Sequence, residues 1–241
     1  MNVNGNENVN KKQKPTDRSP WAFDQIAPTA IVMVLLSIVT TVARGADATQ
    51  PATAPSISVA IDPTTPKGAL KSLAVAMDGG DAQAIRSLLQ TSSPLEERMV
   101  GAMTDEAAAI AAFNRSMIKR FGIAEAAAAL GGDPAEQLKQ SMHNIDTASE
   151  RIDGDTATIS TGPSETMTLK KSNGTWRVSV AALSPGTTPA AVDERIAVVT
   201  AQMKAMQDVT AGILAGKYAT ATDAVAAIRA RLGGPPPATS P

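Results

Sequence analysis

The sequence predicts an α+β domain in which N-terminal helices are followed by a short antiparallel meander sheet and then by C-terminal helices. Three observations support this order: apolar residues first recur at helical spacing, then alternate with polar residues, then return to helical spacing. The single domain is expected over 65–232, with helices plus antiparallel sheet in 65–182 and C-terminal helices in 189–232.

An uncharged apolar run from Ile26 to Ala43 precedes this domain. Its length suits the core of a signal peptide, or the short limit of a spanning helix of about 20 residues. The basic residues before the run predict that the N-terminus stays cytoplasmic while the rest of the chain crosses the membrane. These residues are Lys11, Lys12, Lys14 and Arg18.

The residues after the run leave two possibilities open. Ala46-Asp47-Ala48 is a small-x-small pattern that suits signal peptidase, with cleavage after Ala48. The long polar segment before the run, and Arg44 directly after it, favour an uncleaved signal anchor. Residues 1–48 are therefore predicted to be a signal peptide or an N-terminal membrane anchor. Either way, the domain is expected on the extracytoplasmic side, in the periplasm or cell envelope.

Two segments flank the predicted domain without helical or strand periodicity. Residues 49–64 contain Pro51, Pro55 and Pro63 among Thr, Ser and Ala, which predicts an extended linker. Residues 233–241 are rich in Gly and Pro and predict a disordered tail.

The first helices are delimited by capping signals. Thr65-Pro66 predicts a helix start and Gly79-Gly80 its end, after which Asp81 can cap a second helix. Ser93-Pro94-Leu95-Glu96 predicts a capping box, and the long helix that it opens is expected to stop at Gly122. One apolar face of this helix carries Leu95, Met99, Ile110, Phe113, Met117 and Phe121.

The next segment is predicted to lead from helix to sheet. Ala124 to Leu130 is interpreted as an Ala-rich turn, and Asp133-Pro134 caps a short helix that ends near Met142. A first strand is expected around Ile145 to Ile152.

The meander follows from alternation and from turn residues. Asp153-Gly154-Asp155 and Asn173-Gly174 are predicted hairpin turns. The expected sheet has three or four strands, with one apolar and one polar face. The apolar face is predicted to carry Ala157, Ile159, Met167, Leu169, Trp176, Val178 and Val180.

The helix predicted from about Pro189 has the most regular apolar spacing in the chain. It carries Val192, Ile196, Val199, Met203 and Met206, and resumes at Ile213. This face either covers the domain's own sheet or mediates self-association through the helix from about Val192 to Ile213. We expect the first, because a sheet of this size needs a covering layer.

Two stretches together carry a family resemblance. The helix pair from Thr65-Pro66 to Leu89, followed by a meander ending in Asn173-Gly174-Thr175-Trp176-Arg177-Val178, resembles the nuclear-transport-factor-two-like superfamily. This superfamily is also called the SnoaL-like or cystatin-like cone fold. The resemblance covers about residues 65–182 and implies a curved sheet that wraps a long helix and encloses a pocket. The short sheet and the long helical segment after it depart from that pattern.

Composition excludes several classes of function. The chain has no cysteine, which removes disulfides, thiol catalysis and Cys-ligated metals. The net charge is −1 and no basic cluster is evident, so no nucleic-acid partner is expected.

His143, the only histidine, is the one candidate general base, with Asp146 or Ser141 nearby in sequence. Such a base must lie within hydrogen-bond reach of its partners, and nothing in the spacing provides this, so a surface histidine is expected. No catalytic residue is assigned.

Other candidate sites reduce to turns or core positions. A calcium loop at Asp153 and Asp155 would need further oxygen ligands, and the next acid is Glu165. Asp78-Gly79-Gly80-Asp81 and Gly131-Gly132 lack any phosphate-binding spacing. Trp176 is expected in the core and Tyr218 at a half-exposed helix end. No cofactor and no metal are predicted.

The sequence therefore favours an exported or membrane-anchored extracytoplasmic protein with a non-catalytic binding or interaction domain. The alternative is a small-molecule enzyme, a hydrolase or isomerase, that uses a cone-shaped pocket.

The export hypothesis predicts the effect of placing charges in the apolar run. Replacing Val34 and Leu35 together with Asp should retain the protein in the cytoplasm, because each charge at the centre of such a segment costs about 3 kcal/mol on insertion scales. Cell fractionation measures this, and unchanged fractionation would refute the signal. N-terminal sequencing of the wild type separates cleavage after Ala48 from an uncleaved anchor.

Overall fold

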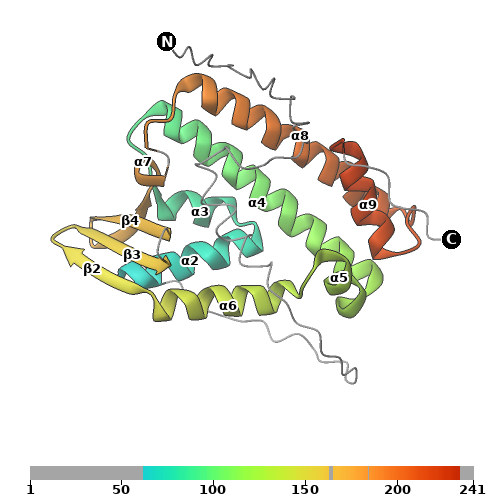
Figure 1. Ribbon diagram of the computed structural model, residues 1–241, viewed down its shortest axis with the longest axis horizontal. Coiled ribbons are helices and arrows are strands. Elements are labelled where there is room, and N and C mark those ends of the chain that lie inside the picture. The colour runs from blue at the N-terminus through green and yellow to red at the C-terminus, as the bar shows by residue number, and fades with distance from the viewer. Residues whose placement is uncertain (1–61, 163–164, 184, 234–241) are drawn as a thin grey trace, which may run out of the picture.

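The computed structural model describes residues 62–162, 165–183 and 185–233. The predicted membrane segment Ile26 to Ala43, the cleavage position after Ala48, most of the linker and the tail from 234 onward lie outside these ranges. Among the helices that the structure describes, none is both long enough and apolar enough to cross a bilayer. Figure 1 shows a helical body with a sheet at one end.

The described helices follow the predicted order, with additions. The helices before the sheet are α2 (Pro66–Gly79), α3 (Ala82–Leu88), α4 (Pro94–Phe121), α5 (Ile123–Leu130) and α6 (Pro134–Thr147). Those after it are α7 (Val180–Leu183), α8 (Pro189–Leu214) and α9 (Ala221–Arg231).

Most of the predicted helix starts carry side-chain caps. The hydroxyl of Thr65 accepts from the backbone N–H of Gly68 at 3.1 Å, and Asp81 caps α3 in the same manner. At α4, Ser93 accepts from the N–H of Glu96, but the Glu96 carboxylate accepts from the N–H of Ser92 rather than of Ser93. One of the two hydrogen bonds of the predicted capping box is therefore present, and the other is made by the backbone N–H of Ser92 in place of Ser93.

The sheet has five strands rather than three or four, and it is mixed rather than wholly antiparallel. The strand order is β1-β5-β4-β3-β2, and β1 is parallel to β5. The strands are β1 (Leu89–Gln90), β2 (Ser149–Asp153), β3 (Thr156–Gly162), β4 (Glu165–Ser172) and β5 (Thr175–Ser179). Two residues are too few to show an alternating pattern, so β1 had no sequence signal.

The tightest predicted hairpin is present between β4 and β5. Asn173 and Gly174 both have positive φ, 52° and 80°, as a two-residue turn that matches the twist of the strands requires. Asp153-Gly154-Asp155 likewise turns the chain from β2 into β3.

Three boundaries differ from the prediction. The Ala-rich segment after Gly122 is helix α5, because Ala has the highest helix propensity and no Gly or Pro interrupts the run. Helix α6 continues to Thr147, so Ile145 is helical and buried instead of starting a strand. Val180, predicted on the sheet, begins α7 and is also buried.

A first hydrophobic cluster fills the space between the sheet and the helices at its back. The inner face of the sheet contributes Ala157, Ile159, Leu169, Trp176 and Val178. Against it pack α2, α3 and the first half of α4, through residues such as Leu70, Leu73, Ile85 and Val100. The predicted apolar face of the meander is therefore confirmed as a core face, apart from Val180.

A second cluster lies at the other end of the molecule. It joins the second half of α4 with α5, α8 and α9, and its fully buried members include Met117, Ala126, Val209 and Ile213. Tyr218 is half-buried in this cluster, and a Cβ at Gly212 would lie 2.7 Å from its ring. Glycine at 212 is thus what lets the Tyr218 ring lie on α8.

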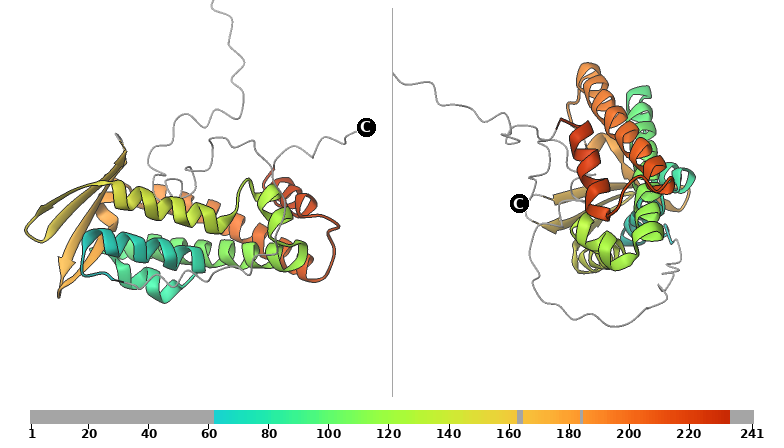
Figure 2. Two further views of the ribbon diagram at one scale, coloured as in Figure 1. Left: turned by 90° about the horizontal axis from the view of Figure 1, so that it is seen from below. Right: turned by 90° about the vertical axis from the view of Figure 1, so that its right-hand side faces the viewer.

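Helix α8 packs along α4 and not on the sheet. The two helices lie side by side and run in the same direction (Figure 1), and Arg98 forms an ion pair with Asp193 near their N-terminal ends. Figure 2 shows the sheet at one end of the helical body, beside the ends of α2 and α6. The expectation that α8 covers the sheet is therefore wrong: α2, α3 and α6 already supply that cover.

The packing of α8 on α4 predicts the effect of a charge at their interface. Val199 is 3% exposed, so Val199→Asp should lower the free energy of unfolding by several kcal/mol, because it buries an unpaired charge. Chemical denaturation followed by circular dichroism measures this. Thr200→Asp, at an exposed position on the same helix, is the control. Equal stability of the two variants would contradict this placement of α8.

Candidate functional site

The three residues considered for catalysis all lie on α6, and the helix separates them. The Ser141 hydroxyl is buried and donates to the carbonyl oxygen of Gln137 at 3.0 Å. His143 is exposed, and its main-chain carbonyl oxygen accepts a hydrogen bond from the Thr147 hydroxyl at 3.0 Å. Because residues two apart on a helix point to opposite sides, Ser141 and His143 do not meet.

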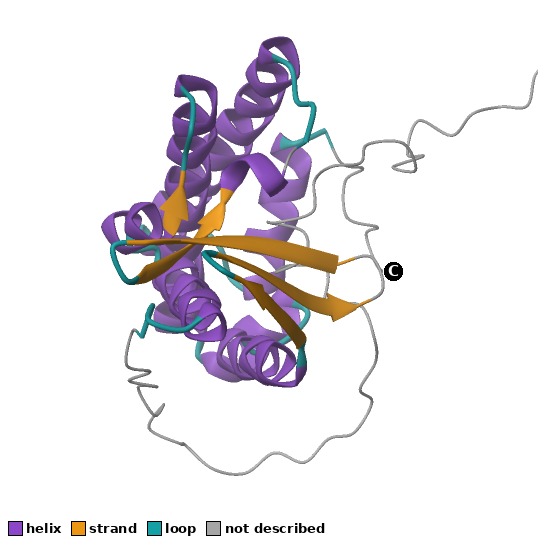
Figure 3. Ribbon diagram, turned by 90° about the vertical axis from the view of Figure 1, so that its left-hand side faces the viewer, coloured by secondary structure: helices purple, strands orange, loops and turns teal. Residues whose placement is uncertain are grey.

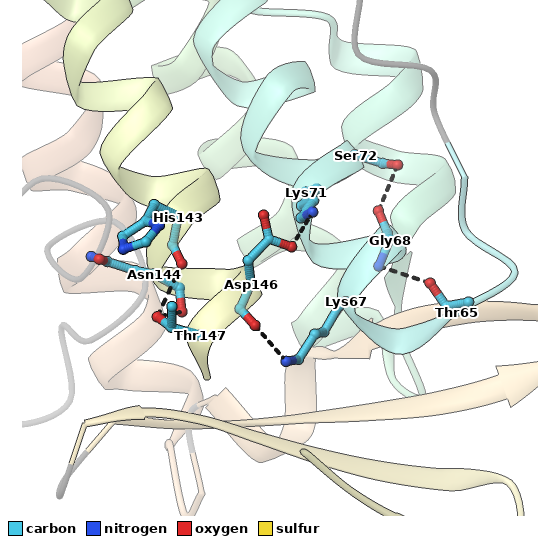
Figure 4. A network of polar contacts seen from close by, with 9 residues as sticks. All are labelled: Thr65, Lys67, Gly68, Lys71, Ser72, His143, Asn144, Asp146 and Thr147. Atoms are coloured by element: carbon cyan, nitrogen blue, oxygen red, sulfur yellow. Dashed lines mark hydrogen bonds and ion pairs between the residues drawn. The ribbon is translucent and has the colours of Figure 1, made fainter. Parts of the chain in front are cut away.

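Asp146 turns toward α2 instead of toward the histidine (Figure 4). Its carboxylate forms an ion pair with Lys71, and its carbonyl oxygen accepts from the Lys67 ammonium at 2.8 Å. These contacts join the end of α6 to the start of α2, next to the sheet (Figure 4). The cluster explains how α6 is held in place, and it directs the Asp146 carboxylate to Lys71 and not to the His143 ring.

The remaining sequence candidates take the structural roles expected of them. Asp153 and Asp155 lie in an exposed hairpin turn, and within the described ranges no group of three or more His, Asp or Glu could hold a metal ion. Gly131 ends α5 in a left-handed conformation. Trp176 is 3% exposed, with the Lys171 ammonium 5.7 Å from its ring centroid.

The outer face of the sheet is the feature that the sequence pattern left without a role. Figure 3 views this face, with the helices behind it. Residues that pair across strands share a face, so the register places many serine and threonine residues on the outer face. They are Ser149, Thr156, Thr158, Ser160, Thr166, Thr168, Ser172, Thr175 and Ser179.

Three cations stand among these hydroxyls: Arg151, Lys170 and Arg177. Lys170 and Arg177 are directly opposite each other on β4 and β5, an arrangement that destabilises a sheet through like-charge repulsion. Among the described residues no ion pair involves any of the three. Asp153 is the acid that shares their face. The face is therefore electropositive.

Two polar atoms at one side of this face lack partners. The Nε of Arg177 and the Oε1 of Gln90 are buried and have no hydrogen-bond partner. Gln90 pairs with Ser179 on β5, and Arg177 lies two residues before Ser179 on the same strand. Gln90 and Arg177 therefore both belong to the outer face. Unpaired buried polar atoms cost free energy, and a partner that supplied acceptors and donors would recover it.

A pocket of about 250 Å³ lies elsewhere, beside the start of α4 and α7. Its lining includes Leu95, Met99 and Val180, with Glu96 as its charged member. His143 is not part of it.

Glu106 is a buried carboxyl on α4, only 6% exposed, and its Oε2 has no hydrogen-bond partner. Burial raises the pKa of Glu106 above its ordinary value, and the positive charge of Arg195 on α8 partly opposes this rise. Ionised Glu106 is therefore a local source of instability beside α8.

Comparison with known proteins identifies no relative. No family model matches the chain, and neither the curated proteins nor the solved structures contain a match. The resemblance to the SnoaL-like superfamily thus stays a prediction.

Glu106 predicts a pH-dependent change in stability. Below the ordinary pKa of a glutamate, the carboxyl is protonated in both the folded and the unfolded protein and does not lower the free energy of unfolding. Because its pKa is raised in the folded protein, the free energy of unfolding falls as pH rises from the ordinary pKa through the folded-state pKa. Glu106→Gln should therefore stabilise the domain at pH 7, with the gain vanishing towards pH 3. Thermal unfolding across pH measures this difference. Asp105→Asn, at the exposed neighbouring position, should not reproduce it.

Proposed function

We propose that this chain is an extracytoplasmic binding protein without catalytic activity, carried across or anchored in the membrane by Ile26 to Ala43. Its binding surface is the outer face of the sheet, and its partner is an anionic polysaccharide of the cell envelope. The observation that carries this proposal is the array of half-buried and exposed hydroxyl residues around Arg151, Lys170 and Arg177.

The chemistry of the face supports this class of partner. Hydroxyl groups both donate and accept hydrogen bonds, as sugar hydroxyls do. The arginines and Lys170 suit carboxylate or sulfate groups. A broad sheet face suits an extended polymer better than a small molecule, which is usually bound in a concave pocket.

The enzyme alternative has less support. It requires an acid, His or Tyr directed into a polar cavity, whereas His143 is exposed on α6 and Tyr218 lies against Gly212. The space behind the sheet is filled by apolar side chains of the first cluster.

The proposal predicts charge-dependent binding to polygalacturonate, a carboxylated polysaccharide, with no binding to neutral dextran. Arg151→Gln combined with Lys170→Gln should weaken binding about two- to thirty-fold, because each exposed charge contributes roughly 0.2–1 kcal/mol, or about 0.4–2 kcal/mol together. The remaining binding should fall as salt is raised. Biolayer interferometry with the immobilised polymer measures both effects.

A matched control removes one arginine and one lysine from another surface. Lys217→Gln combined with Arg229→Gln changes the net charge equally, and both positions are exposed and off the sheet. An equal loss in this control would mean that total charge, and not the sheet face, governs binding. Tight binding to an acidic peptide but not to the polysaccharide would contradict the proposed partner class.

A further inference from the structure

Helix α8 carries a second regular face, opposite the one that packs on α4. The residues toward α4 and the second cluster include Val192, Val199 and Val209, all buried. The opposite face, here called the outer face of α8, has members spaced alternately four and three residues apart. They are Ala190, Glu194, Ala197, Ala201, Lys204, Asp208, Ala211 and Ala215. Every one of them is exposed.

This face differs from an ordinary solvated helix surface. Most of its members are alanines, and Val198 beside them is 45% exposed. A helix that is apolar on two opposite sides is typical of one packed between two partners. In the described part of the chain α4 packs along one side of α8, and α9 contacts α8 near its C-terminal end (Figure 1). The eight members of the outer face stay exposed beside these contacts.

The charges on this face make it complementary to itself in one orientation. In an antiparallel pair of α8 helices centred near residue 199, Ala197 would lie opposite Ala201 of the partner subunit. The same register places Glu194 opposite Lys204 of the partner subunit, and by two-fold symmetry the reverse contact forms as well. Two salt bridges would therefore flank a central alanine contact that lets the helices approach closely.

The third charge fits the same register. Asp208 would lie opposite Ala190 of the partner subunit, in the first turn of the partner's α8. A helix N-terminus carries a partial positive charge, so an acid there is stabilising. A parallel pairing would instead bring each of Glu194, Lys204 and Asp208 against its own copy, which is repulsive.

From this pattern we infer that the chain forms an antiparallel homodimer through the outer face of α8. The partner is a second copy because the face matches itself in both charge and spacing. The apolar seam that first suggested self-association, with Val199 at its centre, is occupied by α4, and the dimer uses the opposite side of the helix. Because alanines bury little area, the dimer is of moderate affinity, with a dissociation constant on the order of micromolar.

Charge reversal tests the pairing in the full chain, purified in a mild detergent and measured by sedimentation velocity. Lys204→Glu alone should weaken dimerisation at least ten-fold, and so should Glu194→Lys alone. The double variant Glu194→Lys with Lys204→Glu should restore it, because the bridges re-form with reversed sign. Circular dichroism confirms that each variant is folded. A monomeric wild type at 100 µM, or a dimer indifferent to these changes, would overturn the inference.

Cysteine cross-linking tests the register independently, since the natural chain contains no cysteine. One full chain carries Ala197→Cys and another carries Ala201→Cys, and mild oxidation is applied to each alone and to both expressed together. Covalent dimers should form in the mixture only, because residues 197 and 201 are opposite in the antiparallel register. Strong cross-linking of either variant with itself would indicate a parallel pair and contradict the antiparallel dimer. The absence of cross-linking in the mixture would contradict it as well.

Discussion

Helix α4 contributes to both hydrophobic clusters, and it contacts α2, α3, α5, α7 and α8. Its first half places Val100 and Ala107 behind the sheet, while its second half places Phe113 and Met117 among α5, α8 and α9. Gly80 fits against α4 so closely that a Cβ there would lie 2.8 Å from the Cβ of Ala111. Small residues on α4 bury little apolar area, but they let the neighbouring elements approach the helix closely.

Local patterns predicted the elements well where the signal was local. Thr65, Asp81 and Asn173-Gly174 act through hydrogen bonds or φ values within a few residues, so the sequence alone was sufficient to place the helix starts and the hairpin. Ile145 was misplaced because an apolar residue at a helix end and one at a strand start look alike without their neighbours in space. Strand β1 exists only because β5 pairs with it.

The apolar spacing of α8 was recognised, but its partner could not be deduced from spacing. An amphipathic helix must bury its apolar side, and period alone does not say against what. The same limit applies to the outer face of the sheet. Alternation indicated a polar face, but only the register shows that Lys170 and Arg177 lie directly opposite each other among the hydroxyl groups. His143 shows the converse, since proximity in sequence to Asp146 and Ser141 did not become proximity in space.

The pairing of α4 with α8 joins segments far apart in the chain, as the sequence separation of 95 between Arg98 and Asp193 shows. A contact of such long range forms late, because the intervening loop must be closed before the contact stabilises anything. Until α8 is present, one side of α4 has no cover. A chain that emerges from its N-terminus would therefore stay incompletely folded until nearly all of it had been delivered. In that interval the side of α4 that later packs on α8 is open to chaperones and proteases.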